Sequence, residues 1–332
     1  MDQELITSIL HKKGLIDDRN IEFEPLKGGV SSDIYRVSDG IHAYVVKQAL
    51  PKLKVQSDWY ADISRNRIEQ DFIQFVQSYM PDAVPEIFYK DREHCFFVME
   101  FLDDDYQNWK QELLAGRFEA KTSKKTAELL AEIHIQSWNR EDVKRTFGNV
   151  ANFYGLRIEP YLIATGDRHP EIKNYFLDES ERLGHHQEVL VHGDFSPKNI
   201  MIKDDRVIIL DHEAAWFGDP AFDLAFFLNH LYLKMLFHFS RHKEINDLTQ
   251  VAWTAYMQKW EWEKQEEMEG RTGRLLLMLM LARIDGKSPV EYLSEKEAGF
   301  VRSFVHELLP GQIYSQSKIN EYWKLKLKTN ML

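Results

Sequence analysis

The stretch that decides the fold reads His192-Gly193-Asp194-Phe195-Ser196-Pro197-Lys198-Asn199-Ile200-Met201-Ile202. Asp194 and Asn199 stand five residues apart in a polar segment that contains glycine and proline, and the apolar residues that follow predict a short strand. A second predicted strand, 206–210, leads to Asp211, twelve residues after Asn199. The pattern therefore predicts a polar loop between short strands, with carboxylate and amide oxygens at the strand ends.

These oxygens are suited to phosphoryl chemistry. Mg²⁺ takes few protein ligands and prefers hard oxygens together with substrate phosphates, which makes Asn199 and Asp211 candidate metal ligands. A free carboxylate beside such a metal, here Asp194, can accept a hydroxyl proton during phosphoryl transfer. A turn whose Asp and Asn bond the local backbone would explain any one of these residues, but the spaced set favours a site.

Downstream, the segment Gly218-Asp219-Pro220 predicts a helix start with Asp219 as its N-cap. Asp223 is different because it lies inside the apolar run 221–228. A buried carboxylate needs hydrogen-bond donors, and the backbone N–H groups of a tight catalytic loop would supply them. We therefore predict that Asp223, together with His192, is a structural anchor of that loop.

Upstream, a glycine pair lies between two strand-like segments. Gly28 and Gly29 let backbone amides approach a phosphate closely, and Ser31 and Ser32 add donors. Such a pair can equally be a plain turn, so this loop is a phosphate-binding candidate only in combination with other residues.

A lysine and a glutamate follow that loop at informative positions. Lys47 ends the apolar strand 44–46, where its side chain faces either solvent or a cleft. Glu69 borders the apolar stripe of a predicted helix, 66–79, and could pair with Lys47 to hold it against the α- and β-phosphates of a nucleotide. Two other acids, Asp62 and Asp71, lie nearby in the sequence.

The periodicity along the chain predicts an α+β fold with two lobes. Strand patterns at 34–37, 41–46 and 95–101 surround the predicted helix 66–79, and after the acidic run 103–105 helical periodicity dominates. We expect a small antiparallel N-terminal nucleotide-binding lobe at 1–102 and a larger, mostly helical lobe with the catalytic loop and acceptor site at 103–332. The charged segment Trp260 to Glu267 predicts an exposed helix.

Composition excludes several classes of protein. The 332 residues are 44% hydrophobic, which is enough for a core, and the formal net charge of −11 argues against general nucleic-acid binding. The single cysteine, Cys95, allows no intramolecular disulfide. We find no membrane span and no basic and apolar leader, so we expect a cytoplasmic protein. The oligomeric state is left open, with a homodimer as one option.

The motifs together resemble a known family. A glycine-rich loop, strand lysine, helix glutamate, His-Gly-Asp loop and strand-end aspartate occur in protein-kinase-like order. The loop at 192–199 and Gly-Asp-Pro-x-x-Asp-Leu-Ala at 218–225 resemble the aminoglycoside phosphotransferase and choline kinase superfamily, over about residues 20 to 300. The segments 46–51 and 99–102 are most similar to its methylthioribose kinase branch.

The resemblance implies a two-lobed protein-kinase-like fold and an ATP-dependent kinase that uses Mg²⁺ and phosphorylates a hydroxyl of a sugar, amino alcohol or aminoglycoside-like acceptor. It implies that Asp194 is the catalytic base, that Asn199 and Asp211 hold Mg²⁺, and that Lys47 binds phosphates with Glu69 as its partner. A catalytically weak, pseudokinase-like nucleotide-binding module is the alternative.

The remaining site residues also follow from the resemblance. It places Gly28, Gly29, Ser31 and Ser32 over the phosphates, and Glu100 and Leu102 in the strand and hinge beside adenine. In this family the acceptor pocket lies beyond the catalytic loop and is lined by the helical lobe. The acceptor-site candidates here are Ser196, Lys198, Glu213 and Arg283.

Overall fold

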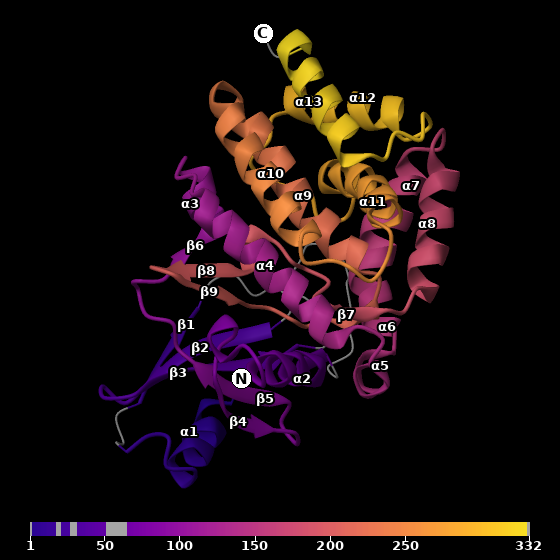
Figure 1. The fold of residues 1–332 in the computed structure, drawn as a ribbon. Helices are drawn as coiled ribbons and strands as arrows, with labels where there is room; N and C mark the ends of the chain where they lie inside the picture. The colour runs from indigo at the N-terminus through magenta and orange to yellow at the C-terminus, as the bar shows by residue number, and fades with distance from the viewer. Residues whose placement is uncertain (1, 18–20, 27–31, 51–64, 331–332) are drawn as a thin grey trace. The chain divides into compact units, whose positions relative to one another are not determined.

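The computed structural model describes residues 2–17, 21–26, 32–50 and 65–330 (Figure 1). The chain divides into two compact units. The first contains Met1–Tyr106 together with the short segment Ile208–Glu213, and the second contains Gln107–Val207 and Ala214–Leu332. The antiparallel sheet and the many helices form the α+β architecture that the sequence predicted.

The first unit is built on a five-stranded antiparallel sheet in the order β1-β2-β3-β5-β4. Its strands are β1 (Glu22–Pro25), β2 (Ser32–Ser38), β3 (Ala43–Ala49), β4 (Ile87–Asp91) and β5 (Phe96–Glu100). The helices of this unit are α1 (Gln3–Lys12), α2 (Arg65–Gln77) and the short 3-10 helix η1 (Pro81–Ala83). The observed β2, β3, β5 and α2 agree with the sequence prediction to within a few residues.

The alternation of side chains along β3 decides where Lys47 points. Successive residues of a strand face opposite sides of the sheet. Val46 packs into the apolar cluster that includes Ile6 and Leu10 of α1. Lys47, the next residue, therefore faces the other side, where it meets Glu69 of α2. The β3 pairing places Lys47 between Ile34 and Phe97, in the middle of the sheet.

The second unit is mostly helical. Its α-helices are α3 (Trp109–Leu114), α4 (Ala120–Ser137), α5 (Glu141–Phe147), α6 (Ala151–Phe153), α7 (Ala164–Arg168), α8 (Lys173–His185), α9 (Pro220–Phe237), α10 (His242–Met257), α11 (Gln265–Asp285), α12 (Glu295–Leu308) and α13 (Gln316–Asn330). A π-helix, η2 (Tyr154–Ile163), and two 3-10 helices, η3 (Pro197–Asn199) and η4 (Phe239–Arg241), join them. Short strands are β6 (Gln107–Asn108), β7 (Val189–Val191), β8 (Ile200–Lys203), β9 (Arg206–Ile209) and β10 (Trp216–Gly218).

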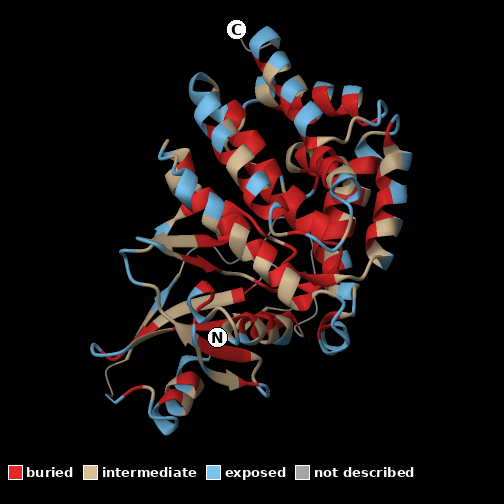
Figure 2. Cartoon of the chain, viewed as in Figure 1, coloured by how far each residue is buried: buried red, intermediate tan, exposed pale blue. Residues whose placement is uncertain are grey.

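The core of the second unit is organised around α9. Every residue from Pro220 to Leu236 is buried, and the helix packs against α4, α10 and α11 (Figure 2). A helix that is apolar on all sides has to be enclosed by others. Asp219 caps it, since the Asp219 carboxylate accepts the Ala221 N–H at 2.9 Å. The predicted cap is therefore confirmed.

The prediction for Trp260 to Glu267 is wrong at its start. Trp260 is only 1% exposed, and α11 begins later, at Gln265. The Trp260 ring packs against Trp138, and its indole N–H donates to the Glu263 carboxylate at 3.1 Å. The charged residues of this segment led to the prediction of an exposed helix. The contact between Trp138 and Trp260 joins segments far apart in the sequence and has no signal in the local pattern.

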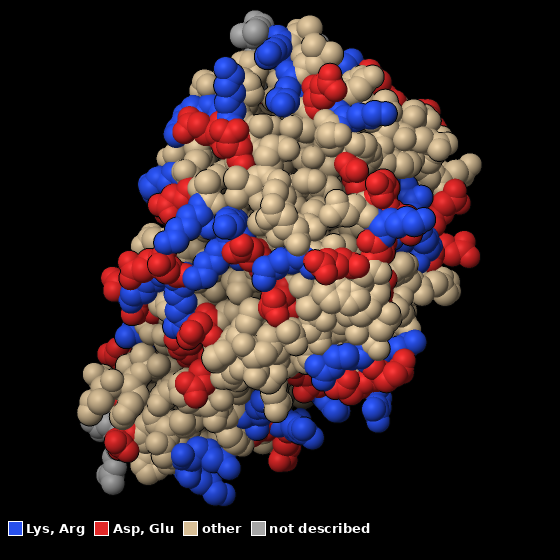
Figure 3. Space-filling model, viewed as in Figure 1, with Lys and Arg blue, Asp and Glu red and all other residues tan. Residues whose placement is uncertain are grey.

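Charges on the face shown in Figure 3 are interspersed, with acidic residues beside most of the basic ones. Within the described part of the chain, no helix is long and apolar enough to cross a membrane.

Candidate active site

Lys47 is the centre of an ion-pair cluster in the first unit. Its ammonium lies 2.7 Å from the Glu69 carboxylate and 2.8 Å from that of Asp211. The Lys47 and Glu69 side chains are almost fully buried, whereas Asp211 keeps 27% of its side chain exposed. Of the two acids, Asp211 is therefore the one that a ligand from solvent can reach.

A second buried pair extends this cluster. Arg65, the first residue of α2, is fully buried, and its Nε lies 3.0 Å from a Glu213 carboxylate oxygen. Arg65 also donates to the Leu50 carbonyl. Between Glu213 and Asp211, His212 stacks on Phe72 of α2 with 4.4 Å between ring centroids. The short segment 208–213 is thereby fixed to α2 through charge and ring contacts.

The carboxyl groups of the cluster shift the pKa of Lys47. Burial lowers the pKa of Lys47, but the carboxylates of Asp211, Glu69 and Glu213 outweigh burial, so the pKa is raised overall and the ammonium stays charged. Burial raises the pKa of Glu69, although Lys47 opposes the shift. Among the described residues, the carboxyl groups of Glu69, Asp211 and Glu213 thus lie beside Lys47 and Arg65. The donor set fits a divalent cation at the exposed carboxylate of Asp211.

Asp211 has an unusual backbone. Its φ is +66°, in the left-handed region that non-glycine residues seldom adopt. Aspartate tolerates this region better than most residues, and such conformations concentrate where a site needs them. The turn after β9 is therefore shaped so that this side chain meets Lys47.

In the second unit, Asp223 of α9 holds the loop after β7. Its carboxylate is fully buried and accepts the His192 N–H at 2.6 Å and the Gly193 N–H at 2.9 Å. His134 of α4 lies 3.4 Å away, and its other ring nitrogen lies 2.7 Å from the Tyr256 hydroxyl. The His192 Nδ1 accepts the Asp194 N–H at 3.1 Å, so that imidazole carries its proton on Nε2 when neutral.

Asp194 has a basic neighbour that orients it. The Nη2 of Arg157, from η2, lies 3.0 Å from Oδ2 of Asp194, and Arg157 is only 7% exposed. The Arg157 Nε donates to the Gly193 carbonyl of the same loop. The side-chain amide nitrogen of Asn199 donates to the backbone carbonyl of Asp194 at 3.0 Å. This leaves the side-chain oxygen of Asn199 as a potential metal ligand.

Gly193 is required by this geometry for two reasons. Its φ is +77°, and a Cβ at this position would lie 2.5 Å from the Ala214 carbonyl oxygen. Both the backbone conformation and the close approach therefore exclude any side chain.

The other predicted residues lie as follows. Ser32 is buried at the start of β2, Glu100 ends β5, and Leu102 follows it, half-buried. Ser196 is buried beside η3 and Lys198 is exposed within it. Gly28, Gly29 and Ser31 lie outside the described residues. Arg283, near the end of α11, donates to the Tyr161 hydroxyl at 3.2 Å.

Comparison with known proteins adds to this geometry. A sequence model of the phosphotransferase enzyme family matches residues 22–234. The chain belongs to the phosphotransferase enzyme family. Methylthioribose kinase of Geobacillus thermodenitrificans (strain NG80-2) is 26% identical over 274 residues, which cover 73% of this chain and 68% of that protein.

Two solved structures share the fold of this phosphotransferase. Choline kinase from Cryptosporidium parvum Iowa II has a TM-score of 0.53 at 14% identity, covering 99% of this chain and 94% of its own. Amicoumacin kinase has a TM-score of 0.55 at 12% identity, covering 95% of this chain and 98% of its own. The family match and the similarity to methylthioribose kinase identify the protein as a kinase that transfers phosphate to an alcohol group.

Sequence reasoning about this phosphotransferase missed Arg65 and His134. Arg65 pairs with Glu213 and His134 with Asp223, and in each pair the partner is far along the chain. Neither a sequence motif nor hydrophobic periodicity predicts such a partner. Glu213 was predicted as an acceptor-site residue. In the structure its carboxylate pairs with Arg65.

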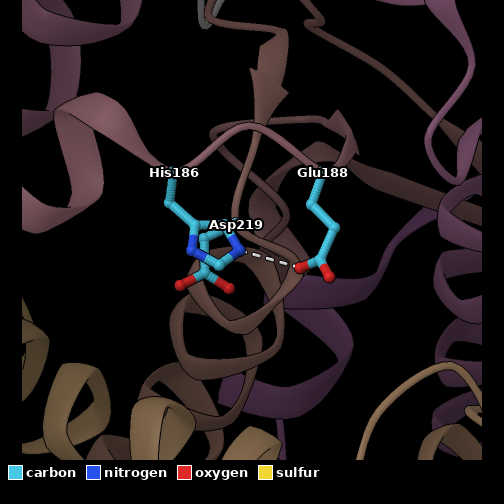
Figure 4. Close-up of side chains that lie close together, drawn as sticks. All are labelled: His186, Glu188 and Asp219. Carbon is cyan, nitrogen blue, oxygen red and sulfur yellow. Dashed lines mark hydrogen bonds and ion pairs between the residues drawn. The ribbon is translucent and has the colours of Figure 1, made fainter.

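A second acidic cluster of the phosphotransferase lies away from these residues. Ligand atoms of His186, Glu188 and Asp219 lie within 4.8 Å of one another (Figure 4). Asp219 already pairs with Arg182 at 2.6 Å and with Arg271 at 3.1 Å. Because two guanidinium groups neutralise it, this cluster is an ion-pair network that joins the start of α9 to α8 and α11.

This network predicts acid sensitivity. Burial raises the pKa of Asp219, but Arg182 and Arg271 outweigh it and lower the pKa from 3.8 to about 2. A depressed pKa contributes stability above the unfolded value, and that stability is lost as the pH falls from about 4 towards 2. The contribution is about 2 kcal/mol.

Urea unfolding at several pH values is expected to show a loss of unfolding free energy at acid pH in the wild type and a smaller loss in Asp219→Asn. The exposed control Asp247→Asn should match the wild type, and equal acid profiles for all three proteins would contradict the assignment.

Proposed function

We propose that the protein transfers the γ-phosphoryl group of Mg·ATP to a hydroxyl of a small molecule. The observation that carries this proposal is the buried ammonium of Lys47 shared between Glu69 and Asp211. A lysine held between two acids is oriented towards one place and stays charged, as binding of α- and β-phosphates requires. The Gly28 to Ser32 segment would cover those phosphates, and the backbone at Glu100 to Leu102 would bind adenine.

Asp194 is proposed as the base that accepts the hydroxyl proton. Arg157 holds one of its oxygens at 3.0 Å, which fixes the direction of the other. The loop that carries Asp194 is fixed in turn by the hydrogen bonds to Asp223. Positioning of this kind supplies much of the catalysis in phosphoryl transfer, because the transition state is loose.

Mg²⁺ is proposed to be held by Asn199 and Asp211. The Asn199 side-chain oxygen is oriented by the hydrogen bond from its amide nitrogen to the Asp194 backbone carbonyl, and Asp211 contributes a partly exposed carboxylate. When bound, the metal neutralises charge on the transferring phosphates.

The expected result of the first experiment is acceptor-dependent ADP release. ATP and Mg²⁺ are incubated with a panel that includes methylthioribose, choline, an aminoglycoside, homoserine and hydroxy acids, and phosphate transfer to the acceptor is confirmed by mass spectrometry. Lys47→Met is expected to lower kcat/KM by roughly 10²-fold or more, because it removes a preorganised charge on the phosphates.

Lys124→Met is the matched control, because Lys124 lies exposed on α4 and makes only a 3.7 Å pair with Glu128. It is expected to behave as the wild type. Tight ATP binding by the wild type without ADP release on any acceptor would favour the pseudokinase-like module. A Lys47→Met variant with undiminished activity would contradict the role of Lys47.

A further inference from the structure

Two basic side chains, His230 and Lys234, lie on the same face of α9 as Phe226. The Phe226 ring is close to Arg157, which pairs with Asp194 of the catalytic loop. Phe226, His230 and Lys234 are four residues apart, so they lie in a row along the helix. Arg283 of α11 acts electrostatically on both His230 and Lys234. We call His230, Lys234 and Arg283 the basic set.

Lys234 is the most informative member of the set. It is 1% exposed, and among the described residues no carboxylate lies within ion-pair distance of its ammonium. The Nζ has one long contact of 3.4 Å to the His230 carbonyl and lies 5.2 Å from the centroid of the Tyr292 ring. The Tyr292 hydroxyl is also buried without a hydrogen-bond partner in the described chain. A buried ammonium without a partner is costly, so this place suits a negatively charged group.

Electrostatics around Lys234 point in the same direction. Burial, followed by Lys110 and Arg283, lowers the pKa of Lys234 to about 7 in total, although Glu291 opposes the shift. The nearby acid, Glu291, is mostly exposed and already pairs with Lys110. Among the described residues, no carboxylate therefore pairs with Lys234, and an anion bound there would favour its charged form.

Aromatic rings connect the basic set to Asp194. The Arg157 guanidinium that holds Asp194 lies 5.6 Å from the centroid of the Tyr161 ring and 5.9 Å from that of Phe226. On its other side, the Phe226 ring lies 5.3 Å from His230. The Tyr161 hydroxyl accepts from Arg283 at 3.2 Å. A continuous row of contacts thus leads from the proposed base to the basic set.

We propose that the acceptor carries, in addition to its hydroxyl, an anionic group, a carboxylate or phosphate, that binds to the basic set. This inference rests on the proposed function and narrows its substrate class. Cationic acceptors such as choline or an aminoglycoside would meet Lys234 and Arg283 with like charge, at a cost in binding. An acid would give Lys234 the partner that the protein does not provide, through charge-assisted hydrogen bonds.

The test uses matched triplets that differ only in charge: gluconate, sorbitol and glucamine, and then glycerate, glycerol and 3-amino-1,2-propanediol. A further pair, ribose 5-phosphate and ribose, separates phosphate from carboxylate. Binding is measured by calorimetry and by thermal shift with and without Mg·ATP, and turnover by ADP release. We expect at least one acid or phosphate to bind about tenfold or more tightly than its neutral and cationic counterparts.

The variants Lys234→Met and Arg283→Gln are expected to abolish that preference while the ATP affinity stays that of the wild type. Met matches the length of the buried lysine stem, so Lys234→Met should fold. The exposed control Lys124→Met should keep the preference. Preference for a neutral or cationic member, equal behaviour of all members, or a preference unchanged in Lys234→Met would overturn the proposal.

Failure of the proposed function gives a different result. In that case no acceptor supports ADP release. Binding of the acids in the absence of nucleotide still tests whether the basic set binds an anionic group. Turnover of a neutral acceptor by the wild type, without any preference for the acid or phosphate members, would refute only the inference about charge.

Discussion

Asp194→Asn is expected to lower kcat by about 10³-fold, because general-base catalysis contributes 10²–10⁴-fold in comparable reactions. Asparagine has the same shape and can still accept a hydrogen bond from Arg157, which lies 3.0 Å from the Asp194 carboxylate. The loop therefore keeps its position, and only the proton acceptor is lost. ATP affinity should stay within roughly twofold of the wild type, since the change removes an interaction of the reacting hydroxyl.

The measurement combines kcat for the best acceptor with calorimetric ATP binding in Mg²⁺. Asp204→Asn is the matched control, because Asp204 is exposed in the turn between β8 and β9 and has a φ of 49° that asparagine tolerates. A variant that loses ATP binding in proportion to kcat would show that Asp194 acts on the nucleotide. Unchanged kcat would remove Asp194 from the mechanism.

Asp223→Ala is expected to cost about 3–5 kcal/mol of unfolding free energy. The carboxylate accepts the N–H groups of His192 and Gly193 at 2.6 and 2.9 Å, and hydrogen bonds to a buried charge contribute about 1.5–3 kcal/mol each. Alanine would leave both donors buried without partners. Asp223→Asn keeps one acceptor oxygen and should cost less.

Urea unfolding measures this loss, and the exposed Asp247→Ala is the control. Where the Asp223 variants remain folded, kcat should fall while the dissociation constant of ATP changes little, since the loop that carries Asp194 loses its anchor. A midpoint of Asp223→Ala equal to that of the wild type would refute the anchoring role.

The helices and strands were predictable because hydrophobic periodicity depends only on residues that are close together in the sequence. The offsets that placed Phe72 and Val76 on one face of α2 also placed Glu69 there, next to buried residues. Asp71, the competing acid, lies on the helix beside Arg67, which is 3.4 Å away and mostly exposed. Glu69 was therefore separable from its neighbour by helical spacing alone.

Other parts of the site were not predictable, because their partners are distant in sequence. Arg65 and Glu213 are 148 positions apart, and Arg271 meets Asp219 across 52. Buried ion pairs of this kind follow from tertiary packing, and one sequence carries no periodic signal of them. Lys234 was missed for a related reason, because its neighbours Arg283 and Tyr292 lie far along the chain.

The allocation of residues 208–213 to the first unit has a practical consequence for protein engineering. A fragment that stops at Tyr106 would lack Asp211 and Glu213, and so would remove the Asp211 carboxylate from Lys47 and the Glu213 carboxylate from Arg65. No single cut of the polypeptide releases both units complete. A permuted or split version would have to supply the six residues Ile208–Glu213 to the nucleotide-side fragment as a complementing peptide.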